Sequence, residues 1–413
     1  MTTTEAPTTE AKPHKTNPSP TAPDPAPSGD FYGFQSLLSD EDRAFLDNVR
    51  GFMREQVQPV ITHHWSRASF PYELIPAFAA LGTSGLPYSG NGCPGRSPLL
   101  DGMVSMELAR VDPSFATFNG VHGGLAMGSI HLCGSDEQKQ RWLPQMATMQ
   151  LIGAFGLTEP DVGSGASGGL ATSARREGDT WVLDGQKAWI GNATFSDLTI
   201  IWARDVADKQ VKGFVVPKDT PGFSTEKMED KIALRVVQNA RITLDGVRVP
   251  EADRLQNANS FADTAKVLKL TRAGVAWMAV GCAMGAYDNA LAYATQRQQF
   301  GRPIAGFQLV QDLLVRMLGN ITSSMALCVR LSQLQAEGTN RDEQSALAKA
   351  FCTVRMRETV GMARELMGGN GILLEHNVGR FVADAEAIYS YEGTREVNTL
   401  IVGKAITGLS AFV

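Results

Sequence analysis

The spacing of hydrophobic residues changes twice along this chain of 413 residues, and the changes limit the folds it can adopt. From Ser39 to about residue 150, apolar residues recur every three or four positions, as on the buried face of a helix. Between residues 151 and 250 the chain has short runs rich in branched and aromatic residues, such as TWVLDGQKAWI and ARITLDGVRVP, separated by Gly, Asp and Pro. Helical spacing returns after about residue 262. This order predicts an α+β protein with helical, antiparallel β and helical domains rather than an alternating doubly wound sheet.

The N-terminal segment, residues 1–36, differs from the rest in composition. Its first thirty residues contain seven prolines and no aromatic or branched aliphatic side chain. Such a segment cannot bury enough apolar surface to offset the entropy lost on ordering, so we expect a disordered tail, either a plain linker or a proline-rich recognition segment. The remainder then divides into a helical domain at 37–150, a β-domain at 151–262 and a C-terminal helical domain at 263–413.

Charge and cysteine content exclude several classes of function. The chain has 38 Lys and Arg against 43 Asp and Glu, a net charge of -5, and no long basic run, so nucleic-acid binding is not expected. Its five cysteines are widely spread without a C-x-x-C pair, which indicates reduced thiols and a cytoplasmic protein. The adjacent His63 and His64 have no Cys or His cluster around them, so no metal site is predicted.

The sequence does not predict a membrane span or a targeting signal. Residues 273–287 form an apolar stretch without charge between Arg272 and Asp288, which is shorter than the roughly 20 residues that cross a bilayer. We interpret it as a buried helix. The N-terminus lacks the apolar core of a signal peptide, and the final Ala-Phe-Val is not a peroxisomal address.

Four segments contain small, polar or charged residues that a packed core does not need. The first is GLTEPDVGSG at 156–165, whose hydroxyls and glycines could bring backbone N–H groups to a ligand or could simply form a turn. The second, KAWIGNATFSDL, places Trp189 before Gly191 and Asn192. This indole could wall a planar cofactor or belong to the core of a strand.

The other two segments lie in the C-terminal helical part. In RQQFGRPIAGFQ, Arg297 and Arg302 could bind a pyrophosphate through their planar guanidinium groups or could complement the dipole of a helix C-terminus. In ELMGGNGI, three glycines could cradle a phosphate or could end a helix. In IYSYEGTREVN, Glu392 could be a general base tuned by burial or a solvated loop residue.

Together, in this order and spacing, the four segments resemble the acyl-CoA dehydrogenase and acyl-CoA oxidase superfamily of flavoproteins. LTEPDVGS, RQQFG, GGNGI and YEGT are the landmarks, and the resemblance covers residues from about 37 to 413. The ending VNTLIVGKAITG is similar to the glutaryl-CoA dehydrogenase branch and to plant-type short-chain acyl-CoA oxidases. The resemblance implies an N-terminal helical domain, a middle β-domain, a C-terminal four-helix bundle, bound FAD and a homotetramer.

The resemblance also assigns roles to individual residues. The FAD contacts that it implies are Phe155, Leu157, Thr158, Trp189 and Ile190 at the ring, Thr394 and Glu396 along the cofactor, and Arg297, Gln299, Phe300, Glu365, Gly368 and Gly369 at the pyrophosphate and adenosine. The substrate contacts that it implies are Ser164, Arg272, Tyr391 and Gly393.

The implied reaction is α,β-dehydrogenation of an acyl-CoA to a trans-2-enoyl-CoA. Glu392 would take the α-proton while the β-hydrogen leaves as hydride to flavin N5, and donors at the thioester carbonyl would stabilise the enolate-like charge. Some family members carry the base immediately before the position of Arg272, but this chain has Thr271 there, which cannot serve. Electrons would pass to an electron-transferring flavoprotein.

Two departures from the family pattern bear on the substrate and the acceptor. Glutaryl-CoA dehydrogenases have an Arg for the distal carboxylate where this chain has Ala116, so a short monocarboxylic acyl chain is expected over a glutaryl group. Gly191 replaces a Thr that approaches flavin N5 in many dehydrogenases, which leaves a short-chain oxidase that makes peroxide as the alternative. His122, in the same helical region, could be packed in the core or lie near the substrate. A catalytically silent flavin-binding or CoA-binding protein is expected to lack the base, which this chain retains.

Overall fold

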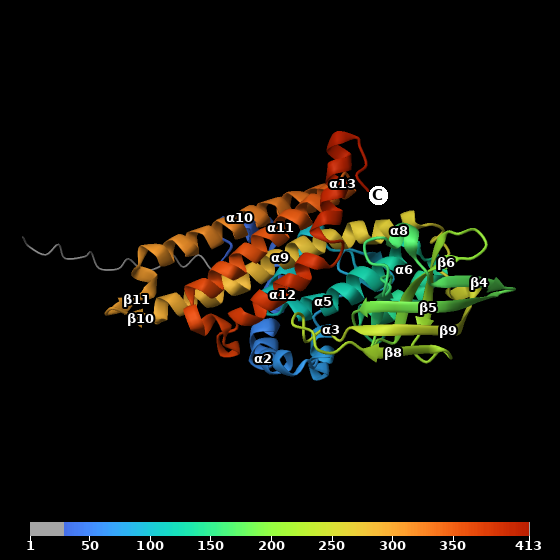
Figure 1. Ribbon diagram of the computed structural model, residues 1–413, viewed down its shortest axis with the longest axis horizontal. Helices are drawn as coiled ribbons and strands as arrows, with labels where there is room; N and C mark the ends of the chain where they lie inside the picture. Colours follow the sequence, from blue (N-terminus) through green and yellow to red (C-terminus); the bar gives the residue numbers. More distant parts are fainter. Residues whose placement is uncertain (1–28, 413) are drawn as a thin grey trace, which may run out of the picture.

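The computed structural model describes residues 29–412 and has three domains, as the change of hydrophobic spacing predicts (Figure 1). The N-terminal helices are α1 (Asp40–Phe52), α2 (Gln58–Arg67), α3 (Ile75–Ala79), α4 (Pro98–Val111), α5 (Pro113–Asn119), α6 (Gly128–Cys133) and α7 (Asp136–Ala147), with the short strands β1 (Ser89–Gly90) and β2 (Cys93–Pro94). Ser39 caps α1 by accepting from the Asp42 backbone, and Ser135 with Gln138 forms a capping box at α7. A π-helical segment, Gly120–Met127, joins α5 to α6.

The middle domain is one seven-stranded sheet with the short helix α8 (Ala166–Gly169). Its strands are β3 (Gly153–Gly156), β4 (Ser173–Glu177), β5 (Thr180–Ile190), β6 (Leu198–Asp205), β7 (Val211–Pro217), β8 (Phe223–Lys227) and β9 (Ala240–Pro250). The order is β3-β6-β4-β5-β9-β8, and β7 also pairs with β6. Most pairings are antiparallel as predicted, but β3 and β4 each run parallel to β6. The sequence did not indicate these two pairings, because neither β3 nor β4 is joined to β6 by a hairpin.

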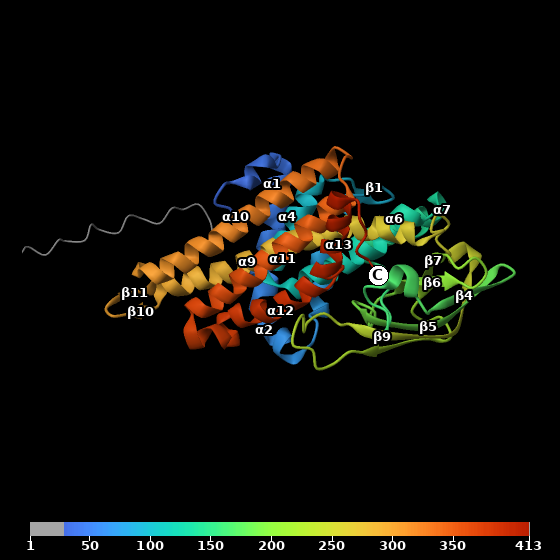
Figure 2. The same cartoon turned by 45° about the horizontal axis from the view of Figure 1, so that its top comes forward.

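The C-terminal domain consists of helices packed side by side, from which the last helix projects (Figures 1 and 2). They are α9 (Phe261–Gln296), α10 (Gln308–Ala336), α11 (Asp342–Leu366), α12 (Val378–Ser390) and α13 (Arg395–Thr407), with β10 (Gln298–Gln299) and β11 (Arg302–Pro303) between α9 and α10. The sheet lies at one end of the molecule and the β10–β11 turn at the other. Helix α9 packs against both α4 and α11. It therefore forms the shared core of the two helical domains.

Among residues 29–412, two helices, α9 and α10, are long and apolar enough to cross a membrane, by length and composition alone. In α9, 72% of the most apolar 18-residue stretch is buried inside the fold. Helix α9 is therefore the buried helix expected from residues 273–287. The corresponding share for α10 is 33%, so much of its apolar surface faces outward.

The folded part of the chain begins before residue 37, although the sequence predicted a tail that ends at residue 36. Both carboxylate oxygens of the buried Asp30 accept backbone hydrogen bonds, from Phe34 at 2.8 Å and from Gln35 at 3.0 Å. Residues Phe34–Leu37 form a 3₁₀ helix. The rest of the predicted tail, residues 1–28, lies outside the described part.

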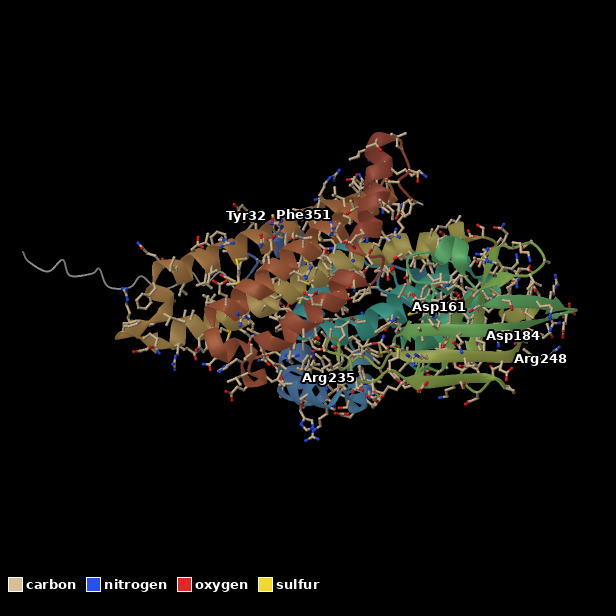
Figure 3. The ribbon with its side chains drawn as sticks, in the orientation of Figure 1. Tyr32, Asp161, Asp184, Arg235, Arg248 and Phe351 are labelled. Atoms are coloured by element: carbon tan, nitrogen blue, oxygen red, sulfur yellow. The ribbon has the colours of Figure 1, made fainter. Side chains whose placement is uncertain are left out.

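Buried polar contacts tie the three domains together around α12. Arg380 Nη1 lies 2.8 Å from Asp112 Oδ2, and both side chains are buried. Asp384, one turn further along, accepts from Trp65 Nε1 at 2.9 Å and from the Leu234 backbone at 2.6 Å. Arg235, which Figure 3 places beside α2, donates to the Trp65 carbonyl at 2.9 Å. These contacts fix α12, which leads directly to Glu392.

Candidate active site

Glu392 lies in the short turn between α12 and α13. Its φ is 57°, in the left-handed region that a non-glycine residue rarely adopts, and Gly393 follows with a φ of 78°. Holding a non-glycine residue in this conformation costs on the order of 1–3 kcal/mol of folding free energy. Such residues persist where surrounding contacts hold them in place, often at a functional site. Thr394 starts α13 by accepting from the Val397 backbone at 3.2 Å.

The Glu392 carboxylate faces α9 rather than open solvent. Thr271 Oγ1 donates to Glu392 Oε1 at 2.5 Å. Burial raises the pKa of the Glu392 carboxyl, while the Thr271 hydrogen bond and the charges of Arg272 and Lys349 oppose that rise. A carboxylate held in this way can act as a general base. The structure thus shows that Glu392 is held against α9 and is not a solvated loop residue.

The residue before the base points into the helical domain. The Tyr391 hydroxyl lies 3.4 Å from Thr117 Oγ1 on α5 and contacts the sulfur of Met278. Burial raises the pKa of this phenol, so it stays neutral. Ala116, beside Thr117, is buried in the apolar core. Thr117 and Tyr391 therefore contribute neutral hydroxyls beside Ala116.

The two residues expected to face CoA lie in different surroundings. Arg272 is buried on α9, and its Nη1 is 2.6 Å from Asp342 Oδ1 at the start of α11. Its Nε is buried without a hydrogen-bond partner in the described structure. Ser164 is exposed in the loop before α8. The structure therefore places one of these residues inside the helical core and the other on a surface loop.

The residues expected at the flavin ring gather where β3 and β5 end. Phe155 on β3, Leu157 and Ile190 are buried, and Thr158 is half-buried. The Ala188 backbone donates to the Thr158 carbonyl at 2.9 Å, which joins the loop after β3 to the end of β5.

Trp189 is 59% exposed, although neighbours on either side are buried. Its φ is 65°, and Asn239 Nδ2 donates to its carbonyl at 3.1 Å. A constrained, left-handed backbone therefore holds an apolar indole out of the core. This is the geometry expected of a wall for a planar ring and not of a core residue.

A buried ion pair supports the loop behind this wall. Lys187 Nζ is 2.8 Å from Glu159 Oε1, with 0% and 4% of the two side chains exposed. Lys187 also donates to the Leu157 carbonyl at 3.2 Å, and Glu159 accepts from the backbones of Ala171 and Thr172. Burial lowers the pKa of Lys187 to about 8. The GLTEP loop is thus a fixed support rather than only a turn.

His122 belongs to the π-helical segment that follows α5, and Gly191 lies against Val121 of the same segment. A Cβ on Gly191 would be 3.1 Å from Val121 Cγ2 and 3.7 Å from Val237 Cγ1, so Val121 occupies space that a larger residue would fill. His122 is fully buried, with Nε2 2.9 Å from the Met146 carbonyl and Nδ1 accepting from the Gly153 backbone at 3.0 Å. Burial lowers its pKa to about 4, so it is neutral. Because backbone groups use both nitrogens, His122 is a packed residue.

The residues expected at the pyrophosphate and adenosine lie at the far end of the bundle. A cavity of about 360 Å³ is lined by Arg297, Gln299, Phe300 and Gly368, among others. Phe300 is 92% exposed, and Glu365 and Gly369 are exposed next to the cavity-lining Gly368. This end carries β10 and β11 and is remote from the sheet (Figures 1 and 2). One copy of the chain therefore does not bring these residues to Trp189.

Two residues expected along the cofactor adjoin the base. Thr394 is half-buried at the start of α13. Glu396 is exposed and forms an ion pair of 2.9 Å with Arg395.

Three features that support the site were not predicted from the sequence: the Thr271 hydrogen bond, the Lys187–Glu159 pair and Lys349. Lys349 is 0% exposed on α11 and donates to the carbonyls of Tyr389 and Gly393. The sequence contains a sign that Lys349 is buried, because Lys349 lies three residues from the apolar Ala346 and Cys352 on one helical face. A lysine at such a position is unusual unless it has buried partners.

Comparison with known proteins agrees with this architecture over almost the whole described chain. The acyl-CoA dehydrogenase N-terminal, middle and C-terminal domain families match residues 39–150, 154–247 and 261–407. The chain belongs to the acyl-CoA dehydrogenase family. It is an oxidoreductase of this FAD-dependent family.

Relatives of known structure and sequence share the full architecture. A glutaryl-CoA dehydrogenase from Mycobacterium smegmatis has a TM-score of 0.89 and 39% identity, covering 92% of this chain and 98% of that one. The butyryl-CoA dehydrogenase of Megasphaera elsdenii has a TM-score of 0.86 and 30% identity, covering 89% and 98%. The mitochondrial short-chain specific acyl-CoA dehydrogenase of Rattus norvegicus is 31% identical over 376 residues, 89% of this chain and 91% of its own length.

The residues present fit the FAD of this family. Trp189 offers an exposed aromatic face beside the loop that carries Thr158. Gly368 and Gly369 are exposed, and within residues 29–412 no heavy atom other than those of the adjoining residues lies within 4 Å of where a Cβ on either would be. Backbone groups of such glycines can come close to a phosphate. The family's cofactor and the geometry of this chain therefore agree.

Proposed function

We propose that the protein oxidises a short-chain, monocarboxylic acyl-CoA to the trans-2-enoyl-CoA, with Glu392 as the base. The observation that carries the proposal is the half-buried Glu392 carboxylate, held by Thr271 in a left-handed turn. When bound, FAD supplies the acceptor for the hydride that leaves the β-carbon. Glu392 takes the α-proton, and burial keeps its pKa raised so that it holds this proton well.

The other residues position and shape the site in this proposal. The Glu392 N–H, presented by its left-handed backbone, donates to the thioester carbonyl, where negative charge develops. Trp189, supported by the Lys187–Glu159 pair, forms the wall opposite the base. The family resemblance assigns Arg272 and Ser164 to the CoA portion and Tyr391 and Gly393 to the acyl group. In one copy of the chain Arg272 is paired with Asp342, and Ser164 lies on a surface loop.

Neutral groups around the acyl chain favour a monocarboxylic substrate. Ala116 is 3% exposed in the apolar core, and the nearby Thr117 and Tyr391 carry hydroxyls and no charge. A second carboxylate beside these three residues would lose its hydration, and none of the three offers it a cation, which costs several kcal/mol. The relatives named for butyryl-CoA and short-chain substrates support the same substrate class, whereas the glutaryl-CoA dehydrogenase at 39% identity does not, so the preference depends on the residues around Ala116. We therefore favour a short acyl chain over glutaryl-CoA.

An electron-transferring flavoprotein is the acceptor that we propose, with oxygen as the alternative. Gly191 would leave room for oxygen at the flavin, as in a short-chain oxidase. Val121, 3.1 Å from the position of a Cβ on Gly191, fills that room in this chain. Restricted oxygen access supports a dehydrogenase.

We also propose a homotetramer in the cytoplasm. The Trp189 wall and the Arg297 cavity lie far apart in one chain, so a neighbouring copy would have to supply the pyrophosphate contacts to each FAD. The outward apolar surface of α10 is suited to such an interface. The five cysteines are free and buried, which supports a reducing compartment.

The proposal is tested by mixing the purified yellow protein with butyryl-CoA without oxygen. Bleaching of the flavin band is expected, and Glu392→Gln should abolish it while FAD stays bound. Absence of bleaching with butyryl-CoA and other short acyl-CoAs would overturn the proposal. Admission of air then distinguishes the acceptors, because rapid recolouring with peroxide would indicate an oxidase.

A further inference from the structure

Lys349 has an unusual environment for a lysine. It lies on the inner face of α11 with 0% of its side chain exposed. Among the residues that the structure describes, no carboxylate oxygen comes within ion-pair distance of its Nζ. Burial of an ammonium group without such a partner is costly, and sites of this kind are retained where the charge or its hydrogen bonds have a role.

The hydrogen bonds of Lys349 bracket the base. Its Nζ donates to the Tyr389 carbonyl at 2.7 Å, in the last turn of α12, and to the Gly393 carbonyl at 2.8 Å. These carbonyls lie three residues before and one residue after Glu392. One ammonium group thus holds both ends of the turn that carries the carboxylate.

This turn needs external support because its backbone is strained. Glu392 has a φ of 57°, in the left-handed region, and surrounding contacts must hold it there. Buried Asn398 adds a second donor, with Nδ2 2.9 Å from the Gly393 carbonyl and 3.0 Å from the Thr394 carbonyl. Lys349 differs from Asn398 because it reaches across from another helix to the α12 side of the turn.

The charge of Lys349 also acts on the base. The charges of Glu392 and Glu396 raise the pKa of Lys349 and so favour its protonated form. The charge of Arg272 lowers this pKa. Burial, the largest effect, lowers the pKa of Lys349 to about 8. The protonated form favours ionised Glu392, whose pKa the Lys349 charge lowers.

We propose that Lys349 is a positioning residue for α-proton abstraction, which clamps the strained Glu392 turn through two carbonyls and holds a positive charge beside the base. This inference rests on the proposed function of Glu392. Lys349 itself does not touch the substrate. It acts by fixing where the carboxylate and the Glu392 N–H point.

The test compares Lys349→Met with the unmodified holoenzyme. Met is close to Lys in length and fills the buried space, but it has neither charge nor donors. We expect the rate of anaerobic flavin reduction by butyryl-CoA to fall by about a hundredfold, as for a misplaced catalytic group. The acid limb of the rate–pH profile should move to higher pH, because Glu392 loses a charge that lowers its pKa.

Two further variants separate positioning from general destabilisation. Thr359→Val, another buried site on α11 whose hydroxyl donates to the Arg355 carbonyl, should retain the wild-type rate and pH profile. Lys349→Arg keeps the charge and should leave the acid limb near its original pH, although the rate falls. If Lys349→Met does not fold, Lys349→Gln, which keeps a donor but no charge, provides the same comparison of pH profiles.

The outcomes distinguish the inference from the function on which it rests. Failure of the unmodified protein to bleach would overturn the proposed function and the inference together. Bleaching by the unmodified protein, with the same rate and acid limb in FAD-loaded Lys349→Met or Lys349→Gln, would overturn the inference alone. A fall in rate in Lys349→Met or Lys349→Gln without any shift of the acid limb would overturn the part of the inference that concerns charge. It would show that Lys349 does not act on Glu392 through its positive charge.

Discussion

Thr271 Oγ1 donates a hydrogen bond of 2.5 Å to Glu392 Oε1, although the two residues are 121 positions apart in the chain. The same hydroxyl lies 3.1 Å from the Val267 carbonyl and 3.3 Å from the Leu268 carbonyl, one turn back on α9. A side chain that cannot itself be the base thus orients the proposed base. The contact joins the core helix of the molecule to the strained turn.

Thr271→Val should shift the pH dependence of the reaction. Valine keeps the shape of the side chain but removes the hydrogen bond that lowers the pKa of Glu392. The base must be ionised to take a proton, so a higher pKa moves the acid limb of flavin reduction to higher pH. Stopped-flow reduction by butyryl-CoA as a function of pH measures this shift. An unchanged acid limb in a folded, FAD-loaded variant would contradict it.

Lys187→Met should weaken both the fold and the flavin site. It leaves Glu159 buried without its cation, which costs about 3–5 kcal/mol in comparable pairs, and it frees the Leu157 carbonyl. Denaturant unfolding and equilibrium dialysis of FAD measure the two effects. The double variant Lys187→Met with Glu159→Gln removes both charges and should recover part of the lost stability. No recovery would mean that charge burial is not the cause.

Arg297→Ala should release FAD while leaving the chain folded. Arg297 is exposed at the β10–β11 end and lines the cavity of about 360 Å³, so little packing depends on it. Its guanidinium group is the cation expected at the pyrophosphate. Flavin content after gel filtration and the thermal unfolding midpoint report on binding and fold separately. Full retention of FAD by this variant would place the pyrophosphate elsewhere.

Asp112→Ala should destabilise the domain arrangement. It leaves Arg380, 2% exposed at its side chain, without its ion-pair partner, at an expected cost of about 3–5 kcal/mol. Glu337→Ala removes the partner of Arg330 at an exposed ion pair of 3.2 Å and should change stability by roughly 0–1 kcal/mol. Urea unfolding followed by tryptophan fluorescence compares the two variants. Similar losses in both would contradict the assignment of Asp112–Arg380 as a buried support.

The sequence by itself determined the order of the domains and the candidate base. Hydrophobic spacing is a local property, so the change from helical to strand periods and back located the domains, and the YEGT landmark pointed to Glu392. The same local reasoning found Trp189, whose exposed indole the structure places beside the loop after β3.

Only the tertiary structure decided how Glu392 is held and whether His122 is packed or free to meet a substrate. The contacts of Glu392 with Thr271 and of Lys349 with Tyr389 and Gly393 join different helices, and no spacing rule predicts such pairs. His122 is a packed residue because backbone groups of two other segments satisfy both its nitrogens. The parallel pairings of β3 and β4 with β6 likewise depend on where the chain enters the sheet. Periodicity fixes which face of an element is buried, whereas the partners of that face are set by the packing of the whole chain.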